Sequence, residues 1–307
     1  MMFRIHFLLC LGVCFFTGCR PFGKATTGSI IPDLELVSVY PVESPTLLEP
    51  SGMTLHDGRL YAVADKVNNQ IFRVELEGNV ARLVPHIQFS PPDRRTMDWE
   101  GITSDPGGSF YLISEERGRL LRVTADGTAV WITPDLRNKG RSLGLFAKSN
   151  AGFEGVAWLG PNHWIGAAER EKRGLVEWSG LDSSLEIEAQ LHMESPYKGA
   201  LPLMRLPDFS GLHADNSNLY ALFRNAHLVV QLEKRDGVWE ETAAWGFENI
   251  ETDPRWAYRS QTYGQAEGLV VDGSDVFLIL DNNRGGKQSD PADRRPLLIH
   301  ARIPDGH

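Results

Sequence analysis

The sequence predicts an all-β protein, a five-bladed β-propeller of four-stranded antiparallel blades, with six blades as the alternative. A short motif of Ser or Glu, then Gly, then an apolar residue occurs five times, and its copies start 49, 54, 56 and 57 residues apart. Each copy begins a series of short apolar segments separated by turn residues. Four-stranded units repeated around an axis form a propeller. The motif copies are Ser51–Met53, Glu100–Ile102, Glu154–Val156, Ser210–Leu212 and Glu267–Leu269.

The second unit shows the strand pattern most clearly. Its Asp-Pro-Gly-Gly and Ala-Asp-Gly sequences are turn signals between apolar segments. The predicted strands of this unit are Gly101–Ser104, Phe110–Ser114, Leu120–Val123 and Ala129–Ile132. Second strands of the other units are predicted at Leu60–Ala64, Trp164–Ala168, Leu219–Phe223 and Val276–Leu280.

The fifth unit has no fourth strand after Leu297–Ile303, but the early segment Leu34–Tyr40 reads as a strand without a partner. We expect this segment to complete the fifth blade as its outer strand, because that pairing closes the ring and covers exposed sheet edges. This expectation favours five blades over six.

The N-terminal segment predicts export. One Arg in the first six residues and the apolar run Phe7–Phe16 form a secretory signal. Phe16-Thr17-Gly18-Cys19 resembles a bacterial lipoprotein signal, so residues 1–19 are expected to be the signal peptide with Cys19 as the lipid anchor. Residues 20–33 would then be a tether and 34–307 a single propeller domain. An ordinary cleaved signal is the alternative.

The composition limits the partners. The 307 residues carry a formal net charge of −9, which argues against a nucleic-acid binder. The three cysteines all lie within the first nineteen residues, so we expect no disulfides in the domain. We expect a monomer in the bacterial envelope, facing the periplasm at the outer membrane, with the lipid anchor as its one membrane contact.

Antiparallel pairing predicts an acidic site. A first strand begins at the sheet edge where the second strand ends, and first strands line the channel of a propeller. Long connections, where binding and catalysis are usually found, lie at the same edge. They are Gln88–Trp99, Asp135–Phe153, Met193–Phe209, Gly246–Ala266 and Asn282–Pro296. The carboxylates expected at this mouth of the channel are Asp65, Glu100, Glu115, Glu154, Glu169, Glu267 and Asp281.

Crowded carboxylates repel one another unless a cation or protons are present, and Ca²⁺ accepts oxygen ligands in flexible geometry. We therefore expect these seven residues to bind a divalent cation, calcium first. Basic residues of the same connections suit an anionic ligand. The substrate-binding candidates are Arg170, Arg224, Asn225 and Asn282, and the catalytic candidates of a metal-dependent ester hydrolase are Glu100, Glu154 and Glu267.

Two alternatives to this hydrolase stay open. The motif carboxylates could instead accept backbone N–H bonds from the neighbouring blade and hold the ring together. The protein could also be a calcium-stabilised binding or scaffold lipoprotein, whose loops bind an envelope ligand without catalysis.

Several segments around the motif carry a family resemblance. They are Asp98–Ile102, Asn150–Gly155, Asp208–Leu212 and Gln265–Leu269, with Ala168–Arg170 and Leu280–Asn283. In these segments the chain resembles the SdiA-regulated family of exported propellers and, more loosely, the domain family called "esterase-like activity of phytase". The resemblance covers Leu48 to the end of the chain. It implies a secreted or lipid-anchored calcium-binding propeller and no single reaction. Arg284–Arg295 is longer than the resemblance leads us to expect, so no roles are transferred there.

Two weaker patterns favour structural interpretations. Gly140–Gly144 matches a nucleophile elbow, but no strand precedes it, as that turn requires. Four aromatic residues in the Gly246–Ala266 connection could form a ligand wall, although packing against the sheets is the favoured interpretation. They are Phe247, Trp256, Tyr258 and Tyr263.

Overall fold

The computed structural model describes residues 31–46, 48–93, 96–148, 151–170, 172–201, 205–215, 218–259 and 264–306. The predicted signal peptide, Cys19 and the tether as far as residue 30 lie outside these residues. None of the helices in the described ranges has the length and hydropathy of a membrane span.

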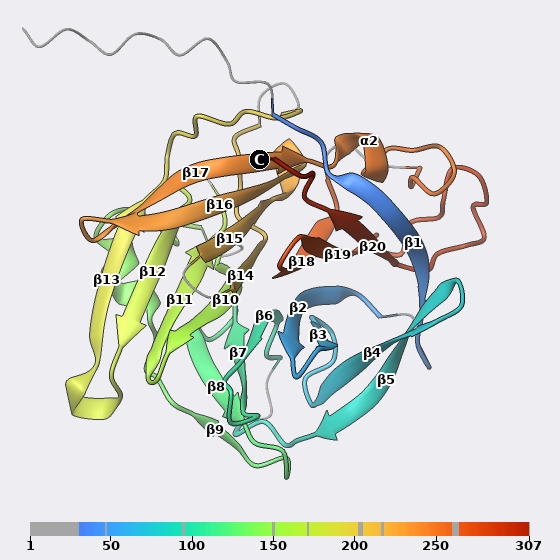
Figure 1. Ribbon diagram of the computed structural model, residues 1–307. Coiled ribbons are helices and arrows are strands. Elements are labelled where there is room, and N and C mark those ends of the chain that lie inside the picture. Colours follow the sequence, from blue (N-terminus) through green and yellow to red (C-terminus); the bar gives the residue numbers. More distant parts are fainter. Residues whose placement is uncertain are drawn as a thin grey trace, which may run out of the picture. The chain divides into compact units, whose positions relative to one another are not determined.

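The described residues form an all-β fold of four-stranded antiparallel groups, as predicted (Figure 1). The first group is β2 (Pro50–His56), β3 (Arg59–Ala64), β4 (Gln70–Glu77) and β5 (Val80–Gln88). The second is β6 (Trp99–Ser104), β7 (Phe110–Ser114), β8 (Arg119–Val123) and β9 (Ala129–Trp131). The third is β10 (Phe153–Gly160), β11 (His163–Ala168), β12 (Gly174–Ser179) and β13 (Glu186–Leu191).

The fourth group is β14 (Gly211–Asp215), β15 (Asn218–Phe223), β16 (Leu228–Arg235) and β17 (Val238–Gly246). The fifth is β18 (Ala266–Asp272), β19 (Asp275–Leu280), β20 (Leu297–Arg302) and β1 (Glu35–Glu43). Two short helices, α1 (Arg137–Arg141) and α2 (Glu248–Glu251), lie in long connections between groups.

The early strand β1 joins the fifth group, as predicted. It pairs antiparallel with β20, with Val39 opposite Ile299. The strand runs to Glu43 and not to Tyr40, because its last residues make a second pairing. There Val42 and Glu43 lie parallel to Ala81 and Arg82 of β5, which connects the fifth group to the first.

The first strands of the groups surround the centre. Strands β2, β6, β10, β14 and β18 contact one another in that cyclic order, which is the arrangement of a β-propeller (Figure 1). The motif glycine allows this approach. A Cβ on Gly101 would lie 2.8 Å from Gly155 Cα, and a Cβ on Gly155 would lie 2.7 Å from Leu212 N. Because real Cβ contacts are longer, the glycine of each motif follows from packing around the axis.

The serine copies of the motif connect neighbouring groups. Ser51 Oγ donates to Trp99 O, and Ser210 Oγ donates to Ala266 O at 2.9 Å. In both cases the acceptor is the residue just before the motif of a neighbouring group. Within the described ranges no backbone N–H donates to the carboxylates of Glu100, Glu154 or Glu267, so the predicted backbone N–H bonds from the neighbouring blade to these glutamates are wrong. The motif serines instead connect neighbouring groups, and each donates to a backbone carbonyl.

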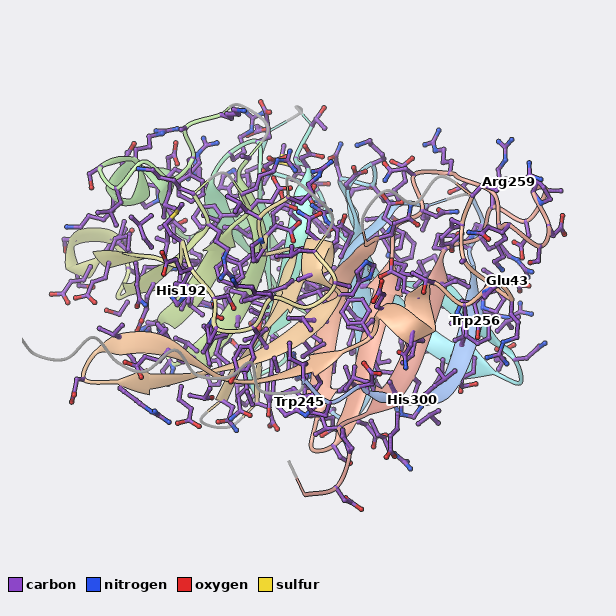
Figure 2. The ribbon with its side chains drawn as sticks, turned by 90° about the horizontal axis from the view of Figure 1, so that it is seen from above. Glu43, His192, Trp245, Trp256, Arg259 and His300 are labelled. Atoms are coloured by element: carbon purple, nitrogen blue, oxygen red, sulfur yellow. The ribbon has the colours of Figure 1, made fainter. Side chains whose placement is uncertain are left out.

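The loop aromatics pack as favoured from the sequence. Phe247 and Tyr258 are fully buried in one apolar cluster with residues of β18, β19 and β20, and Trp256 packs against it. Tyr263 lies outside the described residues. In Figure 2, Arg259 lies towards the top of the view, Trp256 lies below it, and His300, which contacts Asp275 at 2.7 Å beside the β18–β19 turn, lies lower still.

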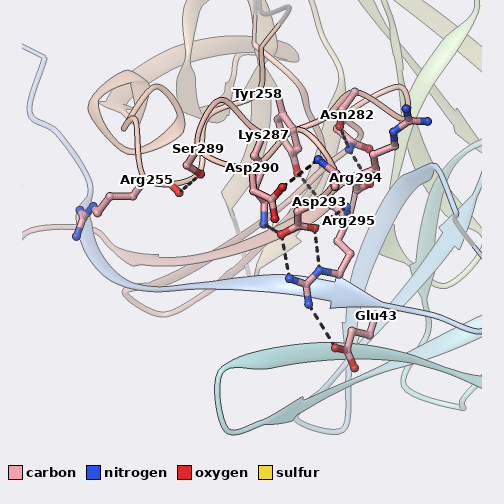
Figure 3. A network of polar contacts seen from close by, with 12 residues as sticks. Glu43, Arg255, Tyr258, Asn282, Lys287, Ser289, Asp290, Asp293, Arg294 and Arg295 are labelled. Atoms are coloured by element: carbon pink, nitrogen blue, oxygen red, sulfur yellow. Dashed lines mark hydrogen bonds and ion pairs between the residues drawn. The ribbon is translucent and has the colours of Figure 1, made fainter.

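The longer-than-expected segment after β19 has its own polar network (Figure 3). Asp293 accepts from Lys287 Nζ at 2.5 Å and from Arg295 Nε at 2.8 Å. Tyr258 Oη donates to Arg295 O at 2.8 Å, and Arg295 Nη1 lies 3.4 Å from Glu43 Oε1 on β1. The segment is therefore fixed to both its neighbouring connection and the strand that closes the fifth group.

Candidate functional site

A polar cavity of about 490 Å³ lies at the ends of the first strands. Glu100 and Glu267 line both this central cavity and a narrow space of about 10 Å³ between the motif glycines, which places the cavity at one mouth of the channel. Eight carboxylates line it: Glu49, Asp65, Glu100, Glu115, Glu154, Glu169, Glu267 and Asp281. Four cationic side chains line it as well: Lys66, Arg170, Arg205 and Arg224.

All seven carboxylates selected from the sequence as cation ligands line this cavity, and a repeated backbone contact brings them there. The N–H of the residue after a second strand donates to the carbonyl two residues before the motif. The pairs are Asp65 to Glu49 (3.1 Å), Glu115 to Asp98 (2.9 Å), Glu169 to Gly152 (3.2 Å) and Asp281 to Gln265 (2.9 Å). The antiparallel geometry thus puts second-strand ends beside motif residues in four groups.

The fourth group uses a side chain at this place. The backbone N–H of Asn225, the second residue after β15, donates to Asp208 Oδ1 at 2.8 Å, so a side-chain oxygen of the residue two before the motif accepts in place of a carbonyl. These contacts identify the residue two before the motif as a further site position, which the sequence interpretation missed. The residue two before the motif is acidic in three copies, namely Glu49, Asp98 and Asp208.

Asp65, Asp98 and Glu100 form the tightest acidic group among the described residues. One carboxylate oxygen from each lies within 4.8 Å of the others, a spacing that could hold a metal ion. Burial raises the pKa of Asp65, and burial together with the charge of Glu267 raises the pKa of Glu100 well above its ordinary value. A cation here would relieve the cost of ionising these groups.

Arg224 neutralises another part of the cavity. Its guanidinium donates to Asp208 Oδ2 at 3.2 Å, to Glu169 Oε1 at 2.9 Å and to Glu267 Oε1. Burial nevertheless raises the pKa of Glu169 to about 7 and of Glu267 to about 8, against the lowering effect of Arg224. Burial also raises the pKa of Glu154 well above its ordinary value, with Glu100 adding to the effect. The carboxylates of this cavity are thus poised to exchange protons or to accept further positive charge.

Several buried oxygens of the cavity have no hydrogen-bond donor among the described residues. They are Asp65 Oδ1, Glu169 Oε2, Asn225 Oδ1 and Glu267 Oε2. Glu169 is only 2% exposed, so water at the surface does not account for its free oxygen. Buried acceptors are normally paired, and a cation or a ligand with donor groups would pair these. The donor set, made of carboxylate and amide oxygens, fits a hard divalent ion.

The predicted substrate-binding residues divide into two sets. Arg170, Arg224 and Asn225 line the central cavity. Asn282 does not, because its amide donates to Gly285 O at 2.7 Å and to Arg294 O at 2.8 Å within the segment after β19 (Figure 3). Asn283, the next residue, lines the cavity, so the structure does not bring Asn282 together with the other predicted substrate-binding residues.

The Gly140–Gly144 pattern is no nucleophile elbow. Gly140 and Arg141 end helix α1, and Ser142 Oγ donates to Lys139 O at 2.7 Å. Ser142 is exposed and does not line the central cavity. The sequence match is a coincidence, as its context indicated.

Solved structures with a similar fold have low sequence identity to this chain. Glutaminyl cyclase from Myxococcus xanthus is 12% identical at a TM-score of 0.49, with 88% of this chain and 95% of that chain covered. A chain of a nidogen/laminin complex is 14% identical at 0.46, with 82% and 83% covered. A catalytically inactive virginiamycin B lyase from Staphylococcus aureus with quinupristin is 14% identical at 0.41, and the match covers 83% of this chain but 66% of the lyase.

No curated protein matches the chain. The model of the SdiA-regulated family matches residues 49–282, which contain all five motif copies and every carboxylate of the central cavity. The motif order, the propeller arrangement and this match agree, and the chain belongs to the SdiA-regulated family.

Proposed function

We propose that this five-bladed propeller is a divalent-cation-dependent hydrolase of an anionic ester, with calcium as the cation and a phosphorylated compound as the leading substrate class. One observation carries the proposal. Asp65 and Glu100, two members of the Asp65–Asp98–Glu100 group, line one cavity together with three arginines, Arg170, Arg205 and Arg224. A cation site and anion-binding groups in one cavity are what hydrolysis of a phosphate ester requires.

Asp65, Asp98 and Glu100 would hold the cation, and Asp281 and Glu49 extend the set of oxygens available to it. When bound, such a cation polarises a phosphoryl or acyl oxygen and lowers the pKa of water. Calcium fits better than magnesium, since it takes six to eight oxygens in irregular geometry.

The chain's own residues would do the remaining work. Arg170 and Arg205 would bind the anionic group, and Arg224 would keep the floor of the cavity close to neutral. Glu154 or Glu267, each with a raised pKa, would hold a proton near neutral pH and give it to the leaving oxygen. In the reaction, the water oxygen bonds to phosphorus or to the acyl carbon, and one proton of the water passes to an ionised carboxylate of the cavity. The ester bond to the leaving oxygen breaks, and that oxygen takes the proton of Glu154 or Glu267.

The test is turnover by the full chain in detergent micelles with phosphomonoesters, phosphodiesters and carboxylic esters, each with calcium or with a chelator. We expect calcium-dependent release of product from one ester class. Glu154→Gln and Glu267→Gln should abolish it while the protein stays folded. Glu186→Gln, an exposed residue of β13, is the matched control and should keep full activity. No turnover on any class would reject the hydrolase.

A scaffold role is the second candidate, and one observation favours it. Arg224 bonds to Glu169, Asp208 and Glu267, which belong to three different strand groups, so this one side chain connects the three groups. In that case calcium would raise the melting temperature without any turnover, and the cavity would bind an envelope ligand.

We also propose that the chain is anchored by Cys19 in the bacterial envelope and faces the periplasm as a monomer. The export signal and the Phe16–Cys19 pattern support this. Radiolabelled fatty acid should be incorporated into the wild-type chain and not into Cys19→Ala. Equal labelling of both would reject the anchor.

A further inference from the structure

Lys66 occupies a corner of the central cavity that the proposed cation also needs. It follows Asp65 directly after β3, and its ammonium contacts Asp65 Oδ2. The same Nζ lies 4.0 Å from Asp98 Oδ1 and 4.0 Å from Glu49 Oε2. Two of the three carboxylates that could hold a metal ion are thus also partners of Lys66.

Lys66 does not provide all the positive charge and hydrogen-bond donors that these carboxylate oxygens can accept. Asp65 Oδ1 is buried without a donor, and so is the almost fully buried Glu169 Oε2 in the same cavity. One ammonium carries a single charge and three donors, whereas a divalent ion carries two charges and takes six to eight oxygens. Arg284 Nε also lies 2.5 Å from Glu49 Oε1, so two single positive charges, those of Lys66 and Arg284, face the carboxylates of Asp65, Asp98 and Glu49. The corner therefore holds less positive charge than its three carboxylates can accept.

Lys66 is also free to leave. Its side chain is 57% exposed, so the ammonium can turn into water, where hydration replaces the contacts with the carboxylates. Arg224 contrasts with it, because the Arg224 guanidinium is buried and bonded to three carboxylates. Of these two cations, only Lys66 has the exposure of a displaceable group.

We propose that Lys66 is a displaceable internal cation: without a divalent ion its ammonium occupies the Asp65–Asp98–Glu49 corner, and binding of the ion expels it. The inference rests on the cation site of the proposed function and adds how cation binding at that site is regulated. Competition by Lys66 sets the concentration at which the site fills, and the expelled ammonium faces the cavity as one more group for an anionic substrate. Removing the charge of Lys66 should therefore tighten cation binding, whereas a merely structural lysine would leave it unchanged or weaker.

The experiment is calorimetric titration of Ca²⁺ into the full chain in detergent micelles at fixed ionic strength. Lys66→Gln should lower the Kd for Ca²⁺ about tenfold or more, since a like charge beside the ion is gone. Lys66→Arg keeps the charge and should stay within about threefold of the wild type. Lys234→Gln is the matched control, because Lys234 is exposed and bonds to Glu177 at 2.7 Å outside the central cavity.

A second measurement guards against a folding defect. Without calcium, Lys66→Gln should melt below the wild type, because the carboxylates beside residue 66 lose the charge of the ammonium. Calcium should then raise the melting temperature of Lys66→Gln by more than it raises that of the wild type. An unchanged or weaker calcium affinity in Lys66→Gln, with wild-type binding intact, would overturn the role of Lys66 alone. If neither protein bound calcium, the cation site of the proposed function would be rejected together with it.

Discussion

Arg224 Nη2 lies 2.9 Å from Glu169 Oε1, which connects the fourth strand group to the third inside the central cavity. The same guanidinium reaches Asp208 and Glu267, so one cation serves three carboxylates. Removing it should be costly, because buried carboxylates would be left without a counter-charge. We expect Arg224→Gln to lower the free energy of unfolding by about 3 to 5 kcal/mol in urea denaturation.

Arg255→Gln is the control for that prediction. Arg255 is exposed and pairs with Asp253 at 2.7 Å outside the cavity, and exposed pairs contribute little. Equal small losses in both variants would show that Arg224 does not hold the strand groups together.

The motif glycine should resist even the smallest substitution. A Cβ on Gly155 would lie 2.7 Å from Leu212 N, which is backbone and cannot move aside. Gly155→Ala should therefore cost about 1 to 3 kcal/mol of unfolding free energy through overpacking, measured by urea denaturation. Gly107→Ala, where the nearest atom is Asp105 Oδ1 at 3.2 Å in a turn, should cost clearly less. The reverse order would contradict the close approach of the first strands.

His213 predicts an acid-sensitive fold. Burial lowers the pKa of His213 to about 4. Because folded His213 resists protonation that the unfolded chain accepts below a pKa of about 6.5, the contribution of His213 to stability is complete above pH 6.5 and is lost as the pH falls towards 4. The loss from this residue is about 3 kcal/mol. Urea denaturation at several pH values should show a weaker loss in His213→Gln, and identical pH profiles would contradict the assignment.

Much of this arrangement could be predicted from the sequence, because local signals determine it. The strands Phe110–Ser114 and Trp164–Ala168 were placed correctly or within one residue by apolar segments between turn signals. Antiparallel pairing then placed Glu100 and Asp65 at the same mouth of the channel. Neither step needs a contact between distant segments.

Other features depend on register or on distant contacts, which the motif alone does not specify. Asp98 was missed because its role follows from the backbone bond between Asp98 O and Glu115 N. Asn282 lies outside the cavity because the segment after β19 binds its amide, whereas Asn283 lines the cavity. The last residues of β1 pair with β5, a contact between blades that no local pattern indicates.

Asp98 also gives a direct prediction for calcium binding. It belongs to the tightest acidic group, so Asp98→Asn should weaken calcium affinity about tenfold or more by removing a charged ligand. Titration calorimetry measures this. Glu186→Gln, which is exposed on β13, should bind calcium as the wild type does, and equal affinities in all three proteins would place the ion elsewhere.

The most direct test of the account is a crystal structure of the full chain grown with calcium. We predict an ion in the central cavity at about 2.3 to 2.6 Å from oxygens of Asp65, Asp98 and Glu100, with the Lys66 ammonium turned away from Asp65. If the cavity held only ordered water at saturating calcium, with Lys66 still bound to Asp65, the structure would contradict the proposed cation site.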